Sequence, residues 1–333
     1  MNDTHWTRAR IPDQEGRTAV VTGANSGLGY ETTKALAANG AHVVMACRSL
    51  DRAREAESRI ERDVPEASLS VREVNLADLA SVEAFAEGFE SEYDRLDLLV
   101  NNAGVMMPPF SRTEDGFELQ VGVSFFGHFA LTGHLVDTLR ATPDARVVTL
   151  SSLAANFARI DFDNLRGEKP YRKLREYGQS KLAALVFALE LQRRLDRAGS
   201  DTASLAAHPG FTTSNLQRYL GALNYLVQPI CMPTEQGALP VLYAATAPDA
   251  EPGGYYGPDG LLEIRGYPGP AKVPSRARDE TTARRLWETA EELTGVRFLS
   301  DGGREGVDDT GDTDGTDDTG DTDGTDDSAR AEP

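Results

Sequence analysis

Short apolar runs that end in small or polar side chains recur from residue 18 to residue 207, and they constrain the fold more than any other feature. The segments between them have the apolar spacing of helices. Strands are expected at 18–21, 42–47, 69–74, 96–100, 146–150 and 203–207, and helices at 79–92, 115–140 and 177–198. This alternation predicts an α/β fold, a doubly wound parallel sheet with right-handed crossovers.

A glycine-rich turn joins the first expected strand to a helix. It reads Thr22-Gly23-Ala24-Asn25-Ser26-Gly27-Leu28-Gly29, and the strand at 42–47 completes a β-α-β unit. Glycines let the backbone approach phosphates, and a helix N-terminus attracts their charge. The turn therefore lies where a Rossmann fold binds the pyrophosphate of a dinucleotide.

The residue after the second strand predicts which dinucleotide is bound. That strand ends in Cys47-Arg48-Ser49, and no carboxylate occurs before Asp51. An acidic side chain there would accept hydrogen bonds from a free ribose 2′-hydroxyl, whereas an arginine would pair with a 2′-phosphate. Arg48 therefore favours NADP(H) over NAD(H). The alternative is an arginine that only caps the strand.

Tyr177 and Lys181 are four residues apart on an expected helix, so their side chains emerge on one face. Two unit charges about 4 Å apart interact by about 4 kcal/mol at an effective dielectric of about 20. That energy is enough to lower a phenol pKa from about 10 towards about 7. The pair predicts an acid–base site, and the alternative is an ordinary surface pair.

The charge of the chain excludes nucleic acid as an expected partner. The formal net charge is −19, and nearly all of the basic residues are arginines. An acidic, lysine-poor surface is typical of proteins in a salt-rich cytosol, although an arginine-biased genome is an alternative. With Cys47 and Cys231 as the only cysteines, no disulfide framework is expected. Without an apolar leader or an eighteen-residue apolar run, we expect a cytoplasmic protein with no membrane span.

Four regions are expected along the chain. Residues 1–14 form an N-terminal extension, and residues 15–298 form the single catalytic domain. Within it, residues 211–235 are rich in leucine and tyrosine and read equally well as a substrate lid or as packing. Residues 299–333 repeat Asp, Gly and Thr without apolar positions, which predicts a disordered acidic C-terminal tail. Weak calcium binding by the tail is the alternative, and no metal site is expected in the domain.

Five motifs in order resemble the short-chain dehydrogenase/reductase family. They are Thr22-Gly23-x-x-x-Gly27-x-Gly29, Asn101-Asn102-Ala103-Gly104, Ser152, Tyr177-x-x-x-Lys181 and Pro209-Gly210. Further sequence segments, including Gly127-His128-Phe129, resemble those of the branch that contains retinol dehydrogenases, WW-domain oxidoreductase and protochlorophyllide reductase. The acidic, arginine-biased version resembles haloarchaeal members.

The resemblance implies a role for each matching residue. Tyr177 exchanges a proton with the oxygen of an alcohol or carbonyl substrate, Lys181 lowers its pKa and binds the nicotinamide ribose, and Ser152 hydrogen-bonds the substrate oxygen. The implied cofactor contacts are Gly23, Asn25, Ser26, Gly27 and Leu28 at the pyrophosphate, Arg48, Asn75, Leu76, Asn102, Ala103 and Gly104 on the adenosine side, and Tyr177, Lys181, Pro209 and Gly210 at the nicotinamide. Hydride transfer needs no metal. Family members commonly pair through the helices at 115–140 and 175–198, so a homodimer is one possible assembly.

Two departures from the family pattern stand out. Ser124 replaces the asparagine that usually holds a proton-relay water near the lysine, and Asn75 replaces an aspartate that contacts adenine. The leading interpretation is an NADP(H)-dependent alcohol dehydrogenase or carbonyl reductase with an apolar substrate. The alternative is an NADP(H)-binding sensor or structural partner with little turnover, which Ser124 keeps open.

Overall fold

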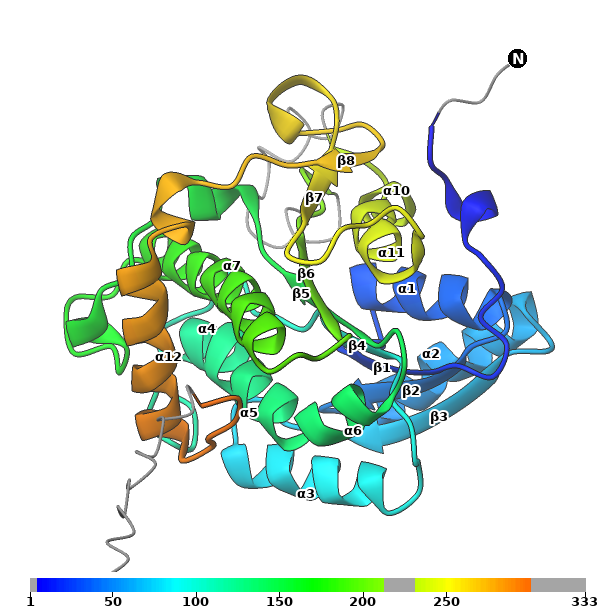
Figure 1. The fold of residues 1–333 in the computed structure, drawn as a ribbon, viewed down its shortest axis with the longest axis horizontal. Helices are drawn as coiled ribbons and strands as arrows, with labels where there is room; N and C mark the ends of the chain where they lie inside the picture. Colours follow the sequence, from blue (N-terminus) through cyan, green and yellow to red (C-terminus); the bar gives the residue numbers. More distant parts are fainter. Residues whose placement is uncertain (1–4, 213–230, 301–333) are drawn as a thin grey trace, which may run out of the picture. The chain divides into compact units, whose positions relative to one another are not determined.

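One eight-stranded sheet forms the centre of the fold in the computed structural model, which describes residues 5–212 and 231–300 (Figure 1). Its order is β3-β2-β1-β4-β5-β6-β7-β8, and every neighbouring pair is parallel except the antiparallel pair β7 and β8. The strands are β1 (Thr18–Thr22), β2 (His42–Cys47), β3 (Ser68–Glu73), β4 (Leu98–Asn101), β5 (Arg146–Leu150), β6 (Ala203–Ala207), β7 (Tyr255–Pro258) and β8 (Pro268–Pro270). The predicted doubly wound parallel sheet is therefore confirmed.

Helices cover both faces of this sheet. On one face lie α1 (Gly27–Ala38), α2 (Leu50–Asp63), α10 (Thr234–Gly237) and α11 (Leu239–Thr246). On the other lie α3 (Leu79–Glu90), α4 (Leu119–Val121), a π-helical segment (Gly122–Phe126), α5 (Gly127–His134), α6 (Val136–Ala141), α7 (Lys173–Arg197) and α12 (Glu280–Thr294). Short 3-10 helices, among them Leu153–Phe157, lie in the connections.

The two layers of the core follow from the alternation of side chains along each strand. In β1, Val20 packs in the cluster that also holds residues of α3, α5 and α7, whereas Ala19 and Val21 pack in the cluster with residues of α1, α2 and α11. All three side chains are fully buried. A parallel sheet covered on both faces explains why its strands read as continuous apolar runs.

Strand order places the expected binding crevice between β1 and β4. The chain runs from β1 outward to β2 and β3, and then returns to the opposite side of β1 as β4. The first connections on the two sides leave the sheet in opposite directions, so the carboxyl ends of β1 and β4 border an opening. The glycine-rich turn follows β1, and Asn102 follows β4.

The helix expected over 115–140 is broken in the structure. The side chain of Glu118 accepts hydrogen bonds from the amides of Gln120 and Val121, which starts the helix at Leu119. The chain then winds as a π-helix over Gly122–Phe126, and a break at Leu135 separates α5 from α6. The helix around Tyr177 also begins earlier than expected, at Lys173.

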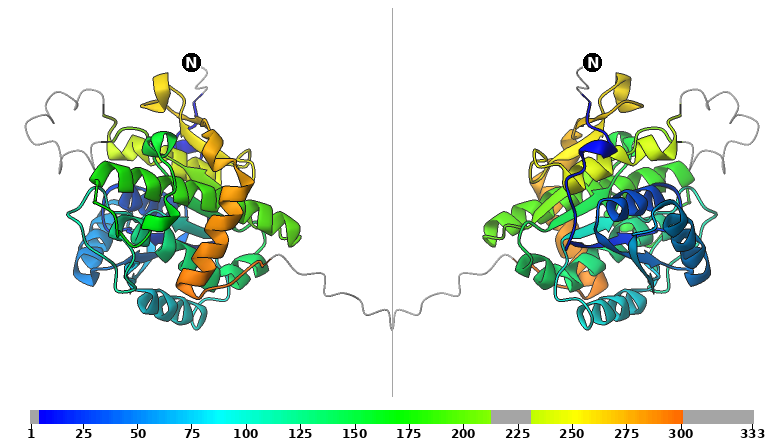
Figure 2. Two further views of the ribbon diagram at one scale, coloured as in Figure 1. Left: turned by 90° about the vertical axis from the view of Figure 1, so that its left-hand side faces the viewer. Right: turned by 90° about the vertical axis from the view of Figure 1, so that its right-hand side faces the viewer.

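The C-terminal helix α12 packs beside α7 (Figures 1 and 2). Trp287 is almost fully buried, with its ring 5.1 Å from that of Phe129 and 5.9 Å from that of Phe187. Phe298 joins the same cluster. Part of the helical surface through which two copies could pair is therefore covered by the chain itself.

Several expectations fall on residues outside the described ranges. They are the first four residues of the N-terminal extension, most of the proposed lid (213–230) and nearly all of the proposed tail (301–333). Within residues 5–212 and 231–300, no helix combines the length and apolar character needed to cross a bilayer.

Candidate dinucleotide site

A cavity of about 330 Å³ lies at the carboxyl ends of β1, β4 and β5. Most residues expected to contact the cofactor line it: Gly23, Asn25, Ser26, Gly27, Leu28, Asn102, Ala103, Gly104, Tyr177, Lys181 and Pro209. Val105, Met106, Leu150 and Ser151 complete the lining. Four of the five sequence motifs, from Gly23 to Pro209, thus meet at one crevice.

The glycine-rich turn is packed too closely for side chains. Gly23 and Gly27 have φ angles of +66° and +57°, which favour glycine. A Cβ on Gly29 would lie only 2.4 Å from the carbonyl oxygen of Gly23 and 2.5 Å from Nδ2 of Asn102. The start of α1 is therefore held directly against the turn and the end of β4.

The crevice fits a dinucleotide on this geometry. Ser26 is the N-cap of the twelve-residue helix α1, and its side chain makes no capping hydrogen bond. The first amides of α1 thus remain available at a crevice that Ser26, Gly27 and Leu28 line. Free amides and the positive end of the helix dipole suit a pyrophosphate.

Tyr177 and Ser152 meet beside the crevice. Tyr177 lies in the first turns of α7 and is only 8% exposed. Its hydroxyl faces the side chain of Ser152, which follows β5. Burial raises the pKa of Tyr177, and the side chain of Ser152 is the opposing influence.

The expected lowering of the Tyr177 pKa by Lys181 is therefore wrong for this structure. The ammonium of Lys181 donates a hydrogen bond to the carbonyl oxygen of Leu150 at 3.1 Å, and its side chain is 6% exposed. Burial lowers the pKa of Lys181 to about 8. Desolvation, which the sequence estimate left out, dominates at both residues.

Ser124 reaches the same place from the π-helical segment. It is fully buried, and its hydroxyl has no hydrogen-bond partner among the described residues. A Cβ built on Gly104 would contact both Oγ of Ser124 and Nζ of Lys181. The structure thus brings together Tyr177, Lys181, Ser152 and Ser124, the four residues predicted to be catalytic.

Four expected cofactor residues do not line the cavity. Arg48 is exposed just beyond β2 and makes no ion pair with the described residues. Asn75 turns its side-chain oxygen to the amide of Ala77, and Leu76 is buried beside Gly127. Gly210, at φ +66°, packs against the carbonyl oxygen of Ile264.

The sequence analysis missed residues that support the site from beneath. The hydroxyl of Thr22 accepts hydrogen bonds from the amides of Asn102 and Ala103, both at 2.9 Å. It also lies 2.9 Å from Nε2 of His128. Ser151 donates to the carbonyl of Lys181. Thr22 and His128 both belong to motifs quoted in the sequence analysis, which could have marked them as part of the site. Their hydrogen-bond partners could not be inferred, because they are distant in sequence.

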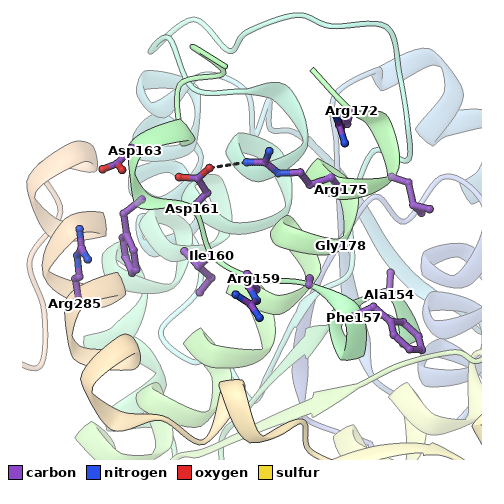
Figure 3. Close-up of a pocket in the computed structure, with 13 residues that line it drawn as sticks. Ala154, Phe157, Arg159, Ile160, Asp161, Asp163, Arg172, Arg175, Gly178 and Arg285 are labelled. Atoms are coloured by element: carbon purple, nitrogen blue, oxygen red, sulfur yellow. Dashed lines mark hydrogen bonds and ion pairs between the residues drawn. The ribbon is translucent and has the colours of Figure 1, made fainter. Parts of the chain in front are cut away.

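A larger cavity of about 1030 Å³ lies against the segment between Ser152 and Tyr177 (Figure 3). Ala154, Phe157 and Ile160 line it together with Gly178 and Arg285, and an ion pair between Asp161 and Arg175 crosses its wall. It shares no lining residue with the dinucleotide crevice. Phe157 and Leu174 of this cavity are exposed.

The sequence matches a family model described as short chain dehydrogenase over residues 17–223. It is 42% identical to retinol dehydrogenase 12 of Mus musculus, over 88% of this chain and 90% of that protein. It is 38% identical to retinol dehydrogenase 14 of Homo sapiens, over 84% and 87%.

Solved structures are similar as well. An uncharacterised protein from Mycobacterium paratuberculosis shares 40% identity and a TM-score of 0.76, covering 89% of this chain and 99% of that one. An RhlG/NADP active-site complex from Pseudomonas aeruginosa has 22% identity and a TM-score of 0.58, covering 73% and 94%. At that identity the second likeness concerns the fold alone.

Proposed function

The chain belongs to the short-chain dehydrogenase family, and on that basis we propose that it is an NADP(H)-dependent oxidoreductase that interconverts an alcohol and a carbonyl compound. The observation that carries the proposal is that Tyr177 and Lys181 line one crevice and that the side chain of Ser152 lies close enough to the Tyr177 hydroxyl to influence its pKa. A protein that only bound a dinucleotide would not need two hydroxyls and a buried ammonium at that point.

Each residue has a distinct part in the proposed reaction. The nicotinamide, when bound, supplies or accepts the hydride. Tyr177 passes a proton to or from the substrate oxygen, and Ser152 donates a hydrogen bond to that oxygen and stabilises its developing charge. Lys181 would hold the nicotinamide ribose and supply a positive charge at the crevice, and its hydrogen bond to the carbonyl of Leu150 orients it.

NADP(H) is proposed over NAD(H) because of Arg48. Its exposed guanidinium stands at the carboxyl end of β2, beside the turn in which the amide of Gly23 donates to the carbonyl of Ala46. No carboxylate lies between the end of β2 and Asp51, where an acidic side chain would favour a free ribose 2′-hydroxyl. The other expected contacts, Asn75, Leu76 and Gly210, are proposed to act at the edges of the crevice.

An apolar substrate is the proposed class. The relatives are named retinol dehydrogenases. The cavity against residues 154–163 is lined by the exposed ring of Phe157 and by the side chain of Ile160. Both residues lie between Ser152 and Tyr177 in the sequence. The apolar side chains of this cavity would bury the hydrocarbon surface of a substrate, and charged side chains such as Arg159, Asp161 and Arg285 complete its lining.

A panel of apolar aldehydes and ketones, followed by loss of NADPH absorbance, tests the proposal. We expect turnover by the natural protein, and a loss of about 10²- to 10⁴-fold in Tyr177→Phe with NADPH binding retained. Tyr171→Phe, which removes another phenol of the same segment, is the matched control and should stay active. Binding of NADPH without turnover of any compound would favour the sensor or structural partner instead.

The surroundings of the enzyme are proposed from its charge. A net charge of −19 and a scarcity of lysine suit a salt-rich cytoplasm, where self-repulsion is screened. The midpoint of unfolding should then rise as KCl is raised towards molar concentrations. Equal stability in dilute buffer would contradict the salt adaptation without affecting the proposed activity.

A further inference from the structure

The imidazole of His128 lies between the two halves of the proposed site. It projects from α5 and is 1% exposed. Its Nε2 atom lies 2.9 Å from the hydroxyl oxygen of Thr22, which ends β1. Its Nδ1 atom lies 3.3 Å from the carbonyl oxygen of Ser124. One side chain thus joins the strand below the glycine-rich turn to the residue beside Lys181.

Counting donors and acceptors assigns the proton on this imidazole. The hydroxyl oxygen of Thr22 already accepts hydrogen bonds from the amides of Asn102 and Ala103. A hydroxyl has two lone pairs and one proton, so it cannot accept a third donor and must donate to Nε2. The weaker contact of this hydroxyl with the carbonyl of Val100 is longer, at 3.3 Å. Nδ1 therefore carries the proton and donates to Ser124.

The imidazole also stays neutral. Burial lowers the pKa of His128 to about 3, so that at neutral pH one nitrogen donates and the other accepts. Only this tautomer satisfies both neighbours at once. A continuous chain of hydrogen bonds then runs from the amides of Asn102 and Ala103 through Thr22 and His128 to the carbonyl of Ser124.

We propose that His128 is a positioning residue that couples the dinucleotide-binding loops to the segment carrying Ser124 and facing Lys181. The inference rests on the proposed function, because it assigns His128 to the same site. Thr22 places the amides of Asn102 and Ala103 at the crevice wall, and His128 fixes the rotamer of the Thr22 hydroxyl. Through the Ser124 carbonyl, the same imidazole holds the π-helical turn against Gly104.

The first measurement needs no substrate or cofactor. Long-range nitrogen–proton spectra of the natural protein, labelled with ¹⁵N at histidine, distinguish the two tautomers. We expect a buried imidazole protonated on Nδ1 and unprotonated on Nε2 from pH 6 to pH 8. A resonance absent in His128→Gln assigns it, and protonation on Nε2 would overturn the proposed chain of hydrogen bonds.

The second measurement uses steady-state kinetics and NADPH fluorescence. In His128→Leu, we expect the KM and Kd for NADPH to rise about tenfold and kcat to fall, with the KM for the carbonyl substrate little changed. His128→Gln can still accept the proton of Thr22 and should recover part of the loss. His134→Gln, in the last turn of the same helix, is the matched control and should behave as the natural protein does.

A merely structural role would give a different pattern. It would lower the melting temperature and the active fraction of His128→Leu while leaving the KM and Kd for NADPH unchanged, and that result would overturn the positioning role. If His128→Leu does not fold, the Kd for NADPH is measured in His128→Gln and in Thr22→Val. Values equal to that of the unsubstituted protein would overturn the positioning role equally. A natural protein that binds no NADPH would overturn the proposed function, and the positioning role with it.

Discussion

The ammonium of Lys181 and the hydroxyl of Ser124 face one point beside Gly104. A Cβ placed on Gly104 would lie 3.2 Å from Nζ of Lys181 and 3.4 Å from Oγ of Ser124. Lys181 is bonded to the carbonyl of Leu150, whereas the Ser124 hydroxyl has no partner among the described residues. We propose that proton delivery at the site depends on the approach of these two polar groups.

Substitution of Ser124 tests this arrangement. Ser124→Ala removes no hydrogen bond to the described protein, so the free energy of unfolding should change by less than about 1 kcal/mol. Ser124→Asn extends a polar amide towards Lys181 and should raise kcat several-fold. Urea unfolding and steady-state rates measure the two effects. A strongly destabilised Ser124→Ala would mean that the hydroxyl has an important partner after all.

The pH dependence of reduction should report Lys181. Burial disfavours the charged form and lowers the pKa of Lys181 to about 8. The side chain is therefore protonated below that pH and becomes neutral above it. Burial raises the pKa of Tyr177, so the phenol keeps its proton through this range. We therefore expect kcat/KM for carbonyl reduction to be constant below about pH 8 and to fall above it.

The profile of Lys173→Gln is the control for that measurement, because Lys173 is an exposed lysine of the same helix. It should keep the same fall above pH 8. A decline that already begins near pH 7 would instead indicate a lowered phenol pKa, as the sequence alone suggested. A flat profile to pH 10 would exclude Lys181 as the titrating group.

Arg48 should determine the choice of cofactor. Arg48→Ala removes the only cation proposed to pair with a 2′-phosphate and should raise the KM for NADPH about tenfold or more, with little change for NADH. Initial rates with both cofactors measure the difference. Arg52→Ala, an exposed arginine one turn into α2, is the matched control. Equal effects of Arg48→Ala on NADPH and NADH would remove Arg48 from the 2′-phosphate site.

Trp287 should contribute strongly to the stability of the domain. Its ring packs on Phe129, Phe187 and Phe298, and the guanidinium of Arg194 lies 4.3 Å from its centre. Trp287→Ala should lower the free energy of unfolding by about 3–5 kcal/mol. Denaturant unfolding followed by circular dichroism measures it.

Leu261→Ala is the control for Trp287→Ala, because Leu261 is 85% exposed and its removal should change the free energy of unfolding by less than about 0.5 kcal/mol.

The oligomeric state can be measured by sedimentation of the same samples. Because α12 covers part of the α5–α7 surface, we expect the natural protein to be a monomer. A dimer that persists at micromolar concentration would show that pairing uses another surface or displaces α12.

The order of strands and helices followed from the sequence because its causes are local. Continuous apolar runs mark strands that are buried on both faces. The turn after β1 needs positive φ angles at Gly23 and Gly27, which glycine adopts readily, so the glycines themselves indicated a tight turn. The right-handed crossover rule then brings the residues after each strand to one edge of the sheet.

The tertiary structure alone decided what those residues meet. The pKa directions of Tyr177 and Lys181 depend on burial by chain segments distant in sequence, and an estimate from their spacing omitted that desolvation. The contact between Thr22 and His128 likewise joins residues 106 positions apart in the sequence. A sequence specifies which groups are present, but only packing sets their solvation and their partners, and these determine their chemistry.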